Sequence, residues 1–184
     1  LGLSQVLNAM ERLGLKAPKR AYPSLLLGAV NYTPLEVAQM YHTLAAGGFR
    51  SEPRTVRAVM TRNDEVLSRY PLAVQRSFEA APVYLLDYAL QSVMWNGTGR
   101  GSAHWLGAQP GVAGKTGTTD DTRDSWFAGF SADTLAVTWV GRDDNGKTGL
   151  TGASGALTVW SQLFSQLDWR ALDLLPPAGV EAQW

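Results

Sequence analysis

The second half of the chain contains three apolar runs whose connections leave little freedom in how they pair. They cover Val112–Thr116, Trp126–Phe130 and Leu135–Arg142, and only Ser131–Thr134 separates the last two. A connection of four residues joins antiparallel strands, because parallel strands need a crossover of a dozen or more residues. In the third run, apolar residues occupy both sets of alternate positions, as a strand covered on both faces requires. We therefore predict an antiparallel sheet at the centre of the fold.

One helix is marked at both ends. Thr33 stands at a capping position, Pro34 at the first helical position, and Glu36 completes a capping box. Two glycines follow Ala46 and supply a stop. These signals predict a helix over Pro34–Ala46.

Apolar residues at helical spacing predict three further helices. The first covers Leu3–Leu13 and ends at Gly14. The second begins at Pro82 and closes at Asn96-Gly97, and the third lies near the C-terminus. Their predicted buried faces are Val83, Leu86, Leu90, Val93 and Met94 in the second helix, and Leu157, Trp160, Phe164 and Leu167 in the third.

Between these helices, residues 54–70 contain two short β runs around the turn dipeptide Asn63-Asp64, which predicts an exposed hairpin. Pro176-Pro177 and the residues around them are expected to form a fraying C-terminal tail from about Asp173. The predicted fold class is α+β, an antiparallel sheet with helices packed on it.

The composition excludes several function classes. Sixteen basic and sixteen acidic side chains cancel over 184 residues, so no net field favours nucleic acid or an anionic membrane surface. There is no cysteine, and His42 and His104 lack a second cluster of ligands, so we expect surface histidines, no metal and no cofactor. No window of about 18 apolar residues exists, and membrane attachment would need an anchor segment outside this chain.

The sequence "GKTGTT", Gly114–Thr119, places a charge, hydroxyls and bare backbone on a predicted strand. The glycines would let a ligand backbone pair with the strand edge. Lys115 supplies a positive charge, and the threonine hydroxyls are donors that suit a carboxylate. One alternative, a phosphate loop, needs G-x-x-x-x-G-K-[ST] opening a helix, and this spacing is absent. A second alternative is a solvated lysine beside a glycine bulge.

The segment "KTGTT" at Lys115–Thr119, followed by "DSWFAGF" at Asp124–Phe130, resembles the Lys-Thr-Gly signature of penicillin-binding proteins and serine β-lactamases. "GAVNYTPLEVAQMYHTLAAGG", "NGTGRGSA" and "VGRDDN" also fall where that family has similar segments. The chain is most similar to the C-terminal part of the transpeptidase domain of bifunctional class A penicillin-binding proteins, the 1b type above all. The resemblance implies an incomplete transpeptidase fold over residues 1–175 and a tail over residues 176–184.

The resemblance implies acyl transfer in peptidoglycan crosslinking. In that family a serine attacks the D-Ala-D-Ala amide of a stem peptide, and β-lactam antibiotics mimic this dipeptide. Carried over by position, Lys115 and Thr118 would be the catalytic residues, and Lys115, Thr116, Gly117, Thr118 and Thr119 would bind substrate. The hydroxyls of Thr116 and Thr118 would hold the terminal carboxylate. The backbone N–H of Thr118 would form half of the oxyanion hole.

Two family motifs are missing from the chain. No serine has Lys three residues later, and none has Asn two residues later, so neither Ser-x-x-Lys nor Ser-x-Asn is present. We expect both motifs upstream, in a protein that also carries a glycosyltransferase domain and acts at the outer face of the bacterial cytoplasmic membrane. The 184 residues alone would then be inactive and would need the missing N-terminal part of the domain or self-association.

Four alternatives remain open. The chain could belong to a β-lactam-sensing or serine β-lactamase-like domain, or to a non-catalytic structural module. Its seven tryptophans could stack on sugars, although most lie on predicted core stripes. The acidic stretch Asp120–Asp124 could bind a cation, although a solvated loop is the simpler interpretation.

Overall fold

The computed structural model describes residues 2–18 and 20–181, and the last three residues of the predicted tail, with Trp184, lie outside this range. The α-helices are α1 (Leu3–Arg12), α2 (Pro34–Ala45), α3 (Ala80–Asn96), α4 (Ala103–Leu106) and α5 (Ala156–Phe164). The strands are β1 (Phe49–Ser51), β2 (Ala58–Met60), β3 (Val66–Arg69), β4 (Val74–Arg76), β5 (Ala113–Thr118), β6 (Ser125–Phe130) and β7 (Leu135–Val140). Short 3-10 helices cover Pro23–Leu27, Arg100–Ser102 and Asp120–Thr122. None of the helices in the described part of the chain combines the length and apolar character that crossing a bilayer requires.

The central sheet has the order β5-β6-β7, and both pairings are antiparallel, which confirms the predicted sheet and the α+β class. Lys115 lies opposite Ala128, and Trp126 lies opposite Trp139. β5 continues to Thr118, two residues beyond the predicted end. β7 stops at Val140, before the predicted Arg142, because the chain then turns, with Asn145 in the left-handed region at φ 54°.

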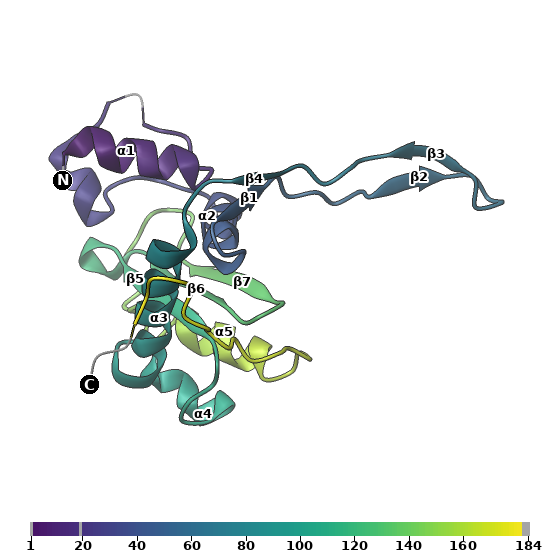
Figure 1. The fold of residues 1–184 in the computed structure, drawn as a ribbon. Coiled ribbons are helices and arrows are strands. Elements are labelled where there is room, and N and C mark those ends of the chain that lie inside the picture. The colour runs from purple at the N-terminus through teal and green to yellow at the C-terminus, as the bar shows by residue number, and fades with distance from the viewer. Residues whose placement is uncertain (1, 19, 182–184) are drawn as a thin grey trace.

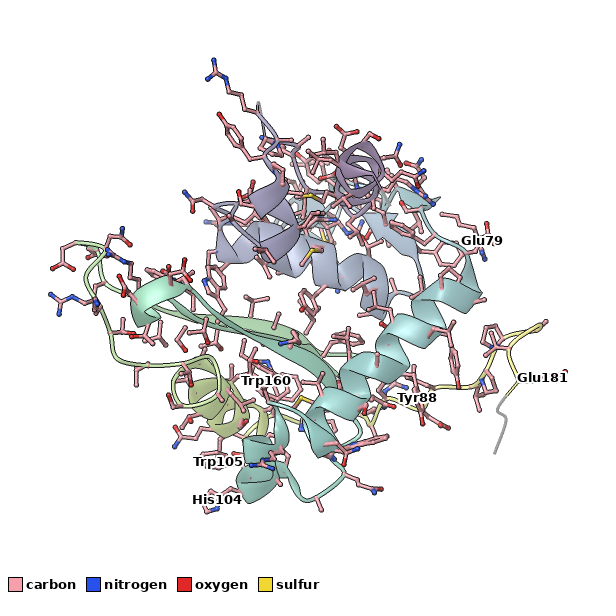
Figure 2. The ribbon with its side chains drawn as sticks, turned by 90° about the vertical axis from the view of Figure 1, so that its left-hand side faces the viewer. Glu79, Tyr88, His104, Trp105, Trp160 and Glu181 are labelled. Atoms are coloured by element: carbon pink, nitrogen blue, oxygen red, sulfur yellow. The ribbon has the colours of Figure 1, made fainter. Side chains whose placement is uncertain are left out.

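Alternation along β6 divides the core into two layers. Phe127 faces α5, where its ring meets Trp160 edge-on at 4.8 Å. Phe130 faces α2, where its ring lies 6.4 Å from that of Tyr41. α2 and α5 therefore cover opposite faces of the sheet, as Figure 2 shows with the sheet between them. β7 contacts both helices, which confirms the two covered faces predicted for this strand.

Trp160 is the largest fully buried side chain of the core. It stacks on Phe164 at 3.8 Å, and its Nε1–H donates to the carbonyl of Ala136 in β7 at 3.1 Å. The indole is therefore satisfied as well as packed. The core-packing interpretation of the tryptophans is confirmed at this position, whereas Trp139 stays 39% exposed on the opposite face.

Helix α2 begins as its sequence predicts. The backbone N–H of Thr33 donates to Glu36 Oε2 at 2.8 Å, and the backbone N–H of Glu36 donates back to Thr33 Oγ1 at 3.3 Å. This reciprocal pair is a complete capping box. The helix ends at Ala45, one residue before the predicted end.

The predicted hairpin is part of a longer arm that leaves the body of the molecule (Figure 1). β2 pairs with β3 in its outer part, and β1 pairs with β4 at its base. Asp64 at the turn has φ 62°, which a short polar side chain tolerates. All the residues of β3 and β4 are exposed, so the prediction of an exposed hairpin is confirmed.

Two helix predictions are wrong in detail. α3 begins at Ala80, so Pro82 lies within its first turn and does not open it. Its buried stripe contains Asp87, which is 5% exposed, whereas the predicted Leu86 is 44% exposed. Leu86 points about 100° away from Asp87 around the helix and lies on the solvent side of the buried stripe.

The last helix is shorter than predicted. α5 ends at Phe164, and Leu167 lies beyond its end and is exposed. The indole N–H of Trp169 donates to the carbonyl of Phe164 at 3.0 Å and so satisfies a helix-end group that another helical turn would have bonded.

Replacing Trp160 should test the core. We expect Trp160→Ala to lower the free energy of unfolding by about 3–5 kcal/mol, because a fully buried aromatic ring is lost and leaves a cavity. Val159→Ala, a half-exposed position on the same helix, should change the free energy by less than about 1 kcal/mol. Urea unfolding followed by circular dichroism measures both, and equal effects would contradict this account of the core.

Asp87 should make stability depend on pH. Burial raises the pKa of Asp87 to about 7, above an unfolded value of about 4, and its Oδ1 has no partner in the described structure. Between these values the folded state holds a proton that the unfolded state has lost, so stability should fall from about pH 4 to about pH 7. Asp87→Asn should flatten this fall in urea titrations at several pH values. The exposed Asp168→Asn should keep it.

Candidate active site

The outer edge of β5 carries the residues that the sequence singled out. The backbone N–H of Thr119 donates to the carbonyl of Asp124 at 3.2 Å, which marks these two as a hydrogen-bonded pair of the ladder. In an antiparallel ladder such pairs alternate with non-bonded ones, so the pair Thr118 and Ser125 is non-bonded. The backbone N–H groups of Thr116 and Thr118 therefore point away from β6, toward the outer edge.

Lysine and hydroxyl groups gather along this edge. Lys115 Nζ donates to the carbonyl of Thr116 at 3.0 Å and lies 3.4 Å from its Oγ1. The lysine therefore folds back along its own strand rather than extending into solvent. Within the described residues it bonds only to Thr116, so its charge is left to act on a ligand.

Thr116 also meets a residue that sequence reasoning missed. Its Oγ1 lies 2.6 Å from the Oγ1 of Thr98, in the loop that follows α3. The segment "NGTGRGSA" was noted for its family resemblance, but no spacing rule connects it to a strand 18 residues later. Only the packing of α3 against β5 brings the two hydroxyls together.

Thr118 is held by a second residue that the sequence did not single out. The backbone N–H of Gly152 donates to Thr118 Oγ1 at 2.8 Å. Gly152 lies close against the sheet, because a Cβ atom there would come 2.6 Å from the carbonyl of Gly117 and 2.8 Å from that of Trp126. Thr118 therefore occupies a defined place between β5 and the segment before α5.

The glycines of the motif serve the core as well as the edge. A Cβ atom on Gly114 would lie 2.6 Å from Cζ of Phe127 and 2.8 Å from the carbonyl of Ala128. The expectation that Gly114 makes room for a ligand backbone is therefore corrected, since the space is already taken by the buried ring. Gly117 does line an open cavity, described below.

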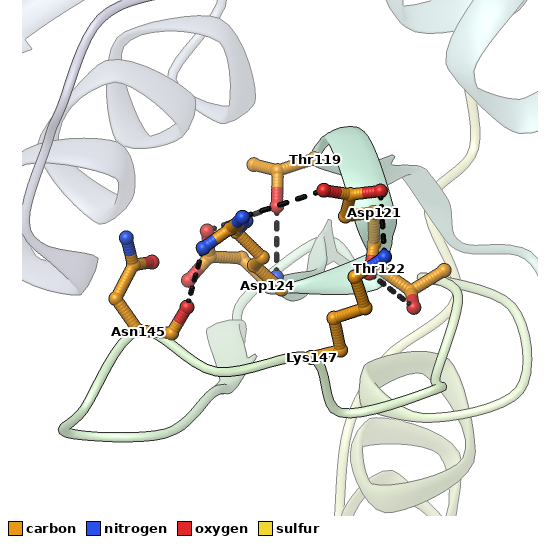
Figure 3. A network of polar contacts seen from close by, with 7 residues as sticks. Thr119, Asp121, Thr122, Asp124, Asn145 and Lys147 are labelled. Atoms are coloured by element: carbon orange, nitrogen blue, oxygen red, sulfur yellow. Dashed lines mark hydrogen bonds and ion pairs between the residues drawn. The ribbon is translucent and has the colours of Figure 1, made fainter.

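The loop after β5 is tied to the segment after β7 by a polar network (Figure 3). Lys147 Nζ lies 2.9 Å from Asp121 Oδ1, and Arg123 lies 3.3 Å from Oδ2 of the same carboxylate. Lys147 first, and then Arg123, lower the pKa of Asp121. Thr148 donates to the carbonyl of Thr122 from both its backbone N–H and its hydroxyl.

The carboxylate of Asp124 is also engaged. It accepts from Thr119 Oγ1 at 3.0 Å and from the indole N–H of Trp139 at 2.9 Å. Protein donors therefore hold the acidic stretch at both Asp121 and Asp124. Among the residues the structure describes, no group of three or more acidic or histidine side chains is placed to hold a metal ion, and both histidines are exposed.

Backbone strain accompanies this network. Asp121 and Thr122 have φ angles of 60° and 54°. A positive φ is unfavourable for a β-branched threonine and persists only where surrounding contacts impose it. The two hydrogen bonds from Thr148 to the carbonyl of Thr122 supply such contacts in the loop that follows β5.

A cavity of about 440 Å³ lies on the α2 side of the sheet beside this edge. Its walls come from the segment before and at the start of α2, the end of β5, and the tryptophan pair of β6 and β7. The lining residues include Asn31, Tyr32, Gly117, Thr119, Trp126 and Trp139. The edge therefore borders an open space large enough for part of a peptide or for packed protein side chains.

Comparison with known proteins decides the family. Residues 7–157 match the family described as "Penicillin binding protein transpeptidase domain". The chain belongs to the penicillin-binding protein transpeptidase family. It is 40% identical over 184 residues to penicillin-binding protein 1B of Escherichia coli and 39% identical to that of Vibrio cholerae, in each case over 98% of this chain.

Solved structures of this transpeptidase family agree with the fold. The crystal structure of penicillin-binding protein 1A from Haemophilus influenzae superposes with a TM-score of 0.80 and 26% identity, over 96% of this chain and 33% of that one. PonA1 from Mycobacterium tuberculosis has a TM-score of 0.76 over 98% of this chain, and its 22% identity supports the fold alone. The chain spans about a fifth of the curated relatives, 21% of the E. coli protein and 23% of the V. cholerae protein.

Gly114→Ala should separate the structural part of the motif from its chemistry. The added Cβ must displace Phe127 or the β6 backbone, so we expect the free energy of unfolding to fall by about 1–3 kcal/mol. Gly101→Ala is the matched control, because its Cβ would meet only Leu157 at an ordinary 3.6 Å. Thermal unfolding measures both, and an unchanged melting temperature for Gly114→Ala would contradict the packing described.

Proposed function

We propose that the chain is the substrate-binding part of a peptidoglycan D,D-transpeptidase. The observation that carries this proposal is the outer edge of β5, where Lys115 and two threonine hydroxyls gather beside unpaired backbone N–H groups in a chain of the transpeptidase family. An extended peptide ending in a carboxylate matches such an edge in hydrogen bonding and in charge. The D-Ala-D-Ala end of a stem peptide has this chemistry.

In the proposed reaction, a serine oxygen attacks the carbonyl carbon of the D-Ala-D-Ala amide, and its proton passes to a base. The carbonyl oxygen becomes an oxyanion, and collapse of the tetrahedral intermediate expels the terminal D-Ala as the protonated amine. An amine of a neighbouring strand then attacks the resulting ester, which forms the crosslink and frees the serine. β-Lactams would follow the first half of this path and remain attached to the serine.

Each motif residue has a proposed role in this path. The ammonium of Lys115 supplies positive charge at the mouth of the site. The hydroxyls of Thr116 and Thr118 donate to the terminal carboxylate. The outward backbone N–H of Thr118 is one donor of the oxyanion hole, a role supported by its place at a non-bonded position of the ladder. Gly117 and Thr119 complete the binding wall toward the cavity.

The chain holds no Ser-x-x-Lys, so we propose that another part of the same transpeptidase domain supplies the serine, its base and the second oxyanion donor. Residues 1–175 would then be the C-terminal part of that domain. The bacterial relatives are about five times longer than this chain, which leaves room for a glycosyltransferase domain and a membrane anchor. The proposed location is the cell envelope, at the outer face of the cytoplasmic membrane.

Recognition of β-lactams has support from structural neighbours. Penicillin-binding protein A of M. tuberculosis has been solved as imipenem and ceftriaxone acyl-enzyme complexes, and these share the fold with TM-scores of 0.63. The carboxylate of a β-lactam would occupy the same hydroxyl pair as the carboxylate of the stem peptide.

Labelling with a fluorescent penicillin tests the proposal. We expect the full-length protein that carries this chain to be acylated stoichiometrically and the isolated 184 residues to remain unlabelled. In the full-length protein, Lys115→Ala should slow acylation by about 100-fold or more, the usual loss when one electrostatic stabiliser is removed. Lys147→Ala should change the rate by no more than about twofold, because it breaks only an exposed ion pair. Covalent labelling of the isolated chain, or equal effects of the two variants, would contradict the proposal.

A further inference from the structure

The two hydroxyls proposed to bind the carboxylate are both contacted by groups outside their own strand. Thr118 Oγ1 receives the Gly152 N–H at 2.8 Å, and Thr116 Oγ1 lies 2.6 Å from Thr98 Oγ1. Nothing in the Lys-Thr-Gly signature includes Thr98 or Gly152. Their positions decide whether the hydroxyl hydrogens of Thr116 and Thr118 are free to bond a ligand carboxylate.

The hydrogen-bond direction at Thr118 is fixed by chemistry. A backbone N–H can only donate, so the Thr118 oxygen accepts from Gly152 and keeps its own hydrogen. Thr118 Oγ1 has no other hydrogen-bond partner within the described structure. Its hydrogen is therefore available to an anion at the strand edge. Accepting a hydrogen bond also polarises the O–H group and makes it a better donor.

The hydrogen of the Thr116 hydroxyl can be located in the same way, from the partners of its oxygen. A hydroxyl oxygen has two lone pairs and one hydrogen. The ammonium of Lys115 can only donate, and it lies 3.4 Å from Thr116 Oγ1, so one lone pair is directed at the lysine. If Thr98 donates to the second lone pair, the hydrogen of Thr116 must point to a third partner. A carboxylate bound at the edge is such a partner.

Thr98 is held in position to play this part. A Cβ atom on Gly97 would lie 2.9 Å from Cα of Val93, and one on Gly99 would lie 2.7 Å from Sδ of Met94. Because neither glycine has a side chain, the loop can lie close against the end of α3. This helix itself packs on β5. The hydroxyl of Thr98 reaches β5 from a tightly packed turn rather than from a free loop.

We propose that Thr98 is a positioning residue for carboxylate recognition, which donates a hydrogen bond to Thr116 and so directs the Thr116 hydroxyl hydrogen at the ligand. The inference rests on the proposed function, because the ligand carboxylate is that of the stem peptide or the β-lactam. Thr98 does not touch the ligand. Its side-chain hydroxyl donates a hydrogen bond to Thr116, as the backbone N–H of Gly152 donates one to Thr118.

The test compares acylation of the full-length protein by penicillin G and by its methyl ester, which lacks the anionic carboxylate. Thr98→Val should lower the second-order acylation rate for the free acid by about tenfold, because the Thr116 hydroxyl is no longer directed at the carboxylate and one hydrogen bond to a charged group is lost. The rate for the ester should stay unchanged. Thr98→Ser, which restores the hydroxyl, should recover the rate for the free acid. Thr158→Val on α5, which removes a hydroxyl bonded to the carbonyl of Ser154, should change neither rate.

A second measurement guards against a folding defect in Thr98→Val. Thr98 acts through Thr116. The double variant Thr98→Val/Thr116→Val should therefore keep the ratio of acid to ester acylation rates that Thr116→Val has alone. Equal losses for acid and ester in Thr98→Val, or additive losses in the double variant, would overturn the positioning role. A wild-type protein that penicillin G does not acylate would overturn the proposed function itself, which distinguishes the two failures.

Discussion

The pairing of β5 with β6 is the constraint on which the other features of this molecule depend. It places Phe127 and Phe130 on opposite faces of the sheet. Phe127 packs against Trp160 of α5, and Phe130 packs against Tyr41 of α2. The same pairing uses one set of backbone groups of β5 and leaves the alternate set at the outer edge. A shift of one residue in β5 would turn its side chains to the opposite face of the sheet and exchange the backbone groups that point to the outer edge.

The six-residue strand β5 therefore contributes both to the core and to the proposed binding edge. Gly114 has no side chain because the ring of Phe127 fills the space beside it, whereas Gly117 opens onto the cavity beside the tryptophan pair. Thr118 is confined by Gly152, which lies against the sheet so closely that a methyl group would not fit. The packing that stabilises the fold thus also supplies the rigidity that the proposed recognition site requires.

The accuracy of the sequence predictions followed the range of the interactions involved. Thr33 and Glu36 predicted the start of α2, because a capping box is made within four residues. The position of Asp87 on the buried stripe of α3 was missed, since a carboxylate there contradicts the hydrophobic pattern and only the packing on β5 reveals it. Thr98 was missed for a related reason, as its partner is 18 residues away in the chain.

The sequence by itself determined the antiparallel sheet, the helix layers, the family and the residue types on which the proposed chemistry of Lys115–Thr119 rests, because these depend on local periodicity, short connections and residue type. Only the tertiary structure decided which hydroxyl meets which donor. Thr98 reaches Thr116 across the α3–β5 contact, and Gly152 reaches Thr118 from a segment 34 residues further along. Hydrogen bonds act over about 3 Å, and a distance of that size between remote residues is set by the packing of whole elements and not by their order in the chain.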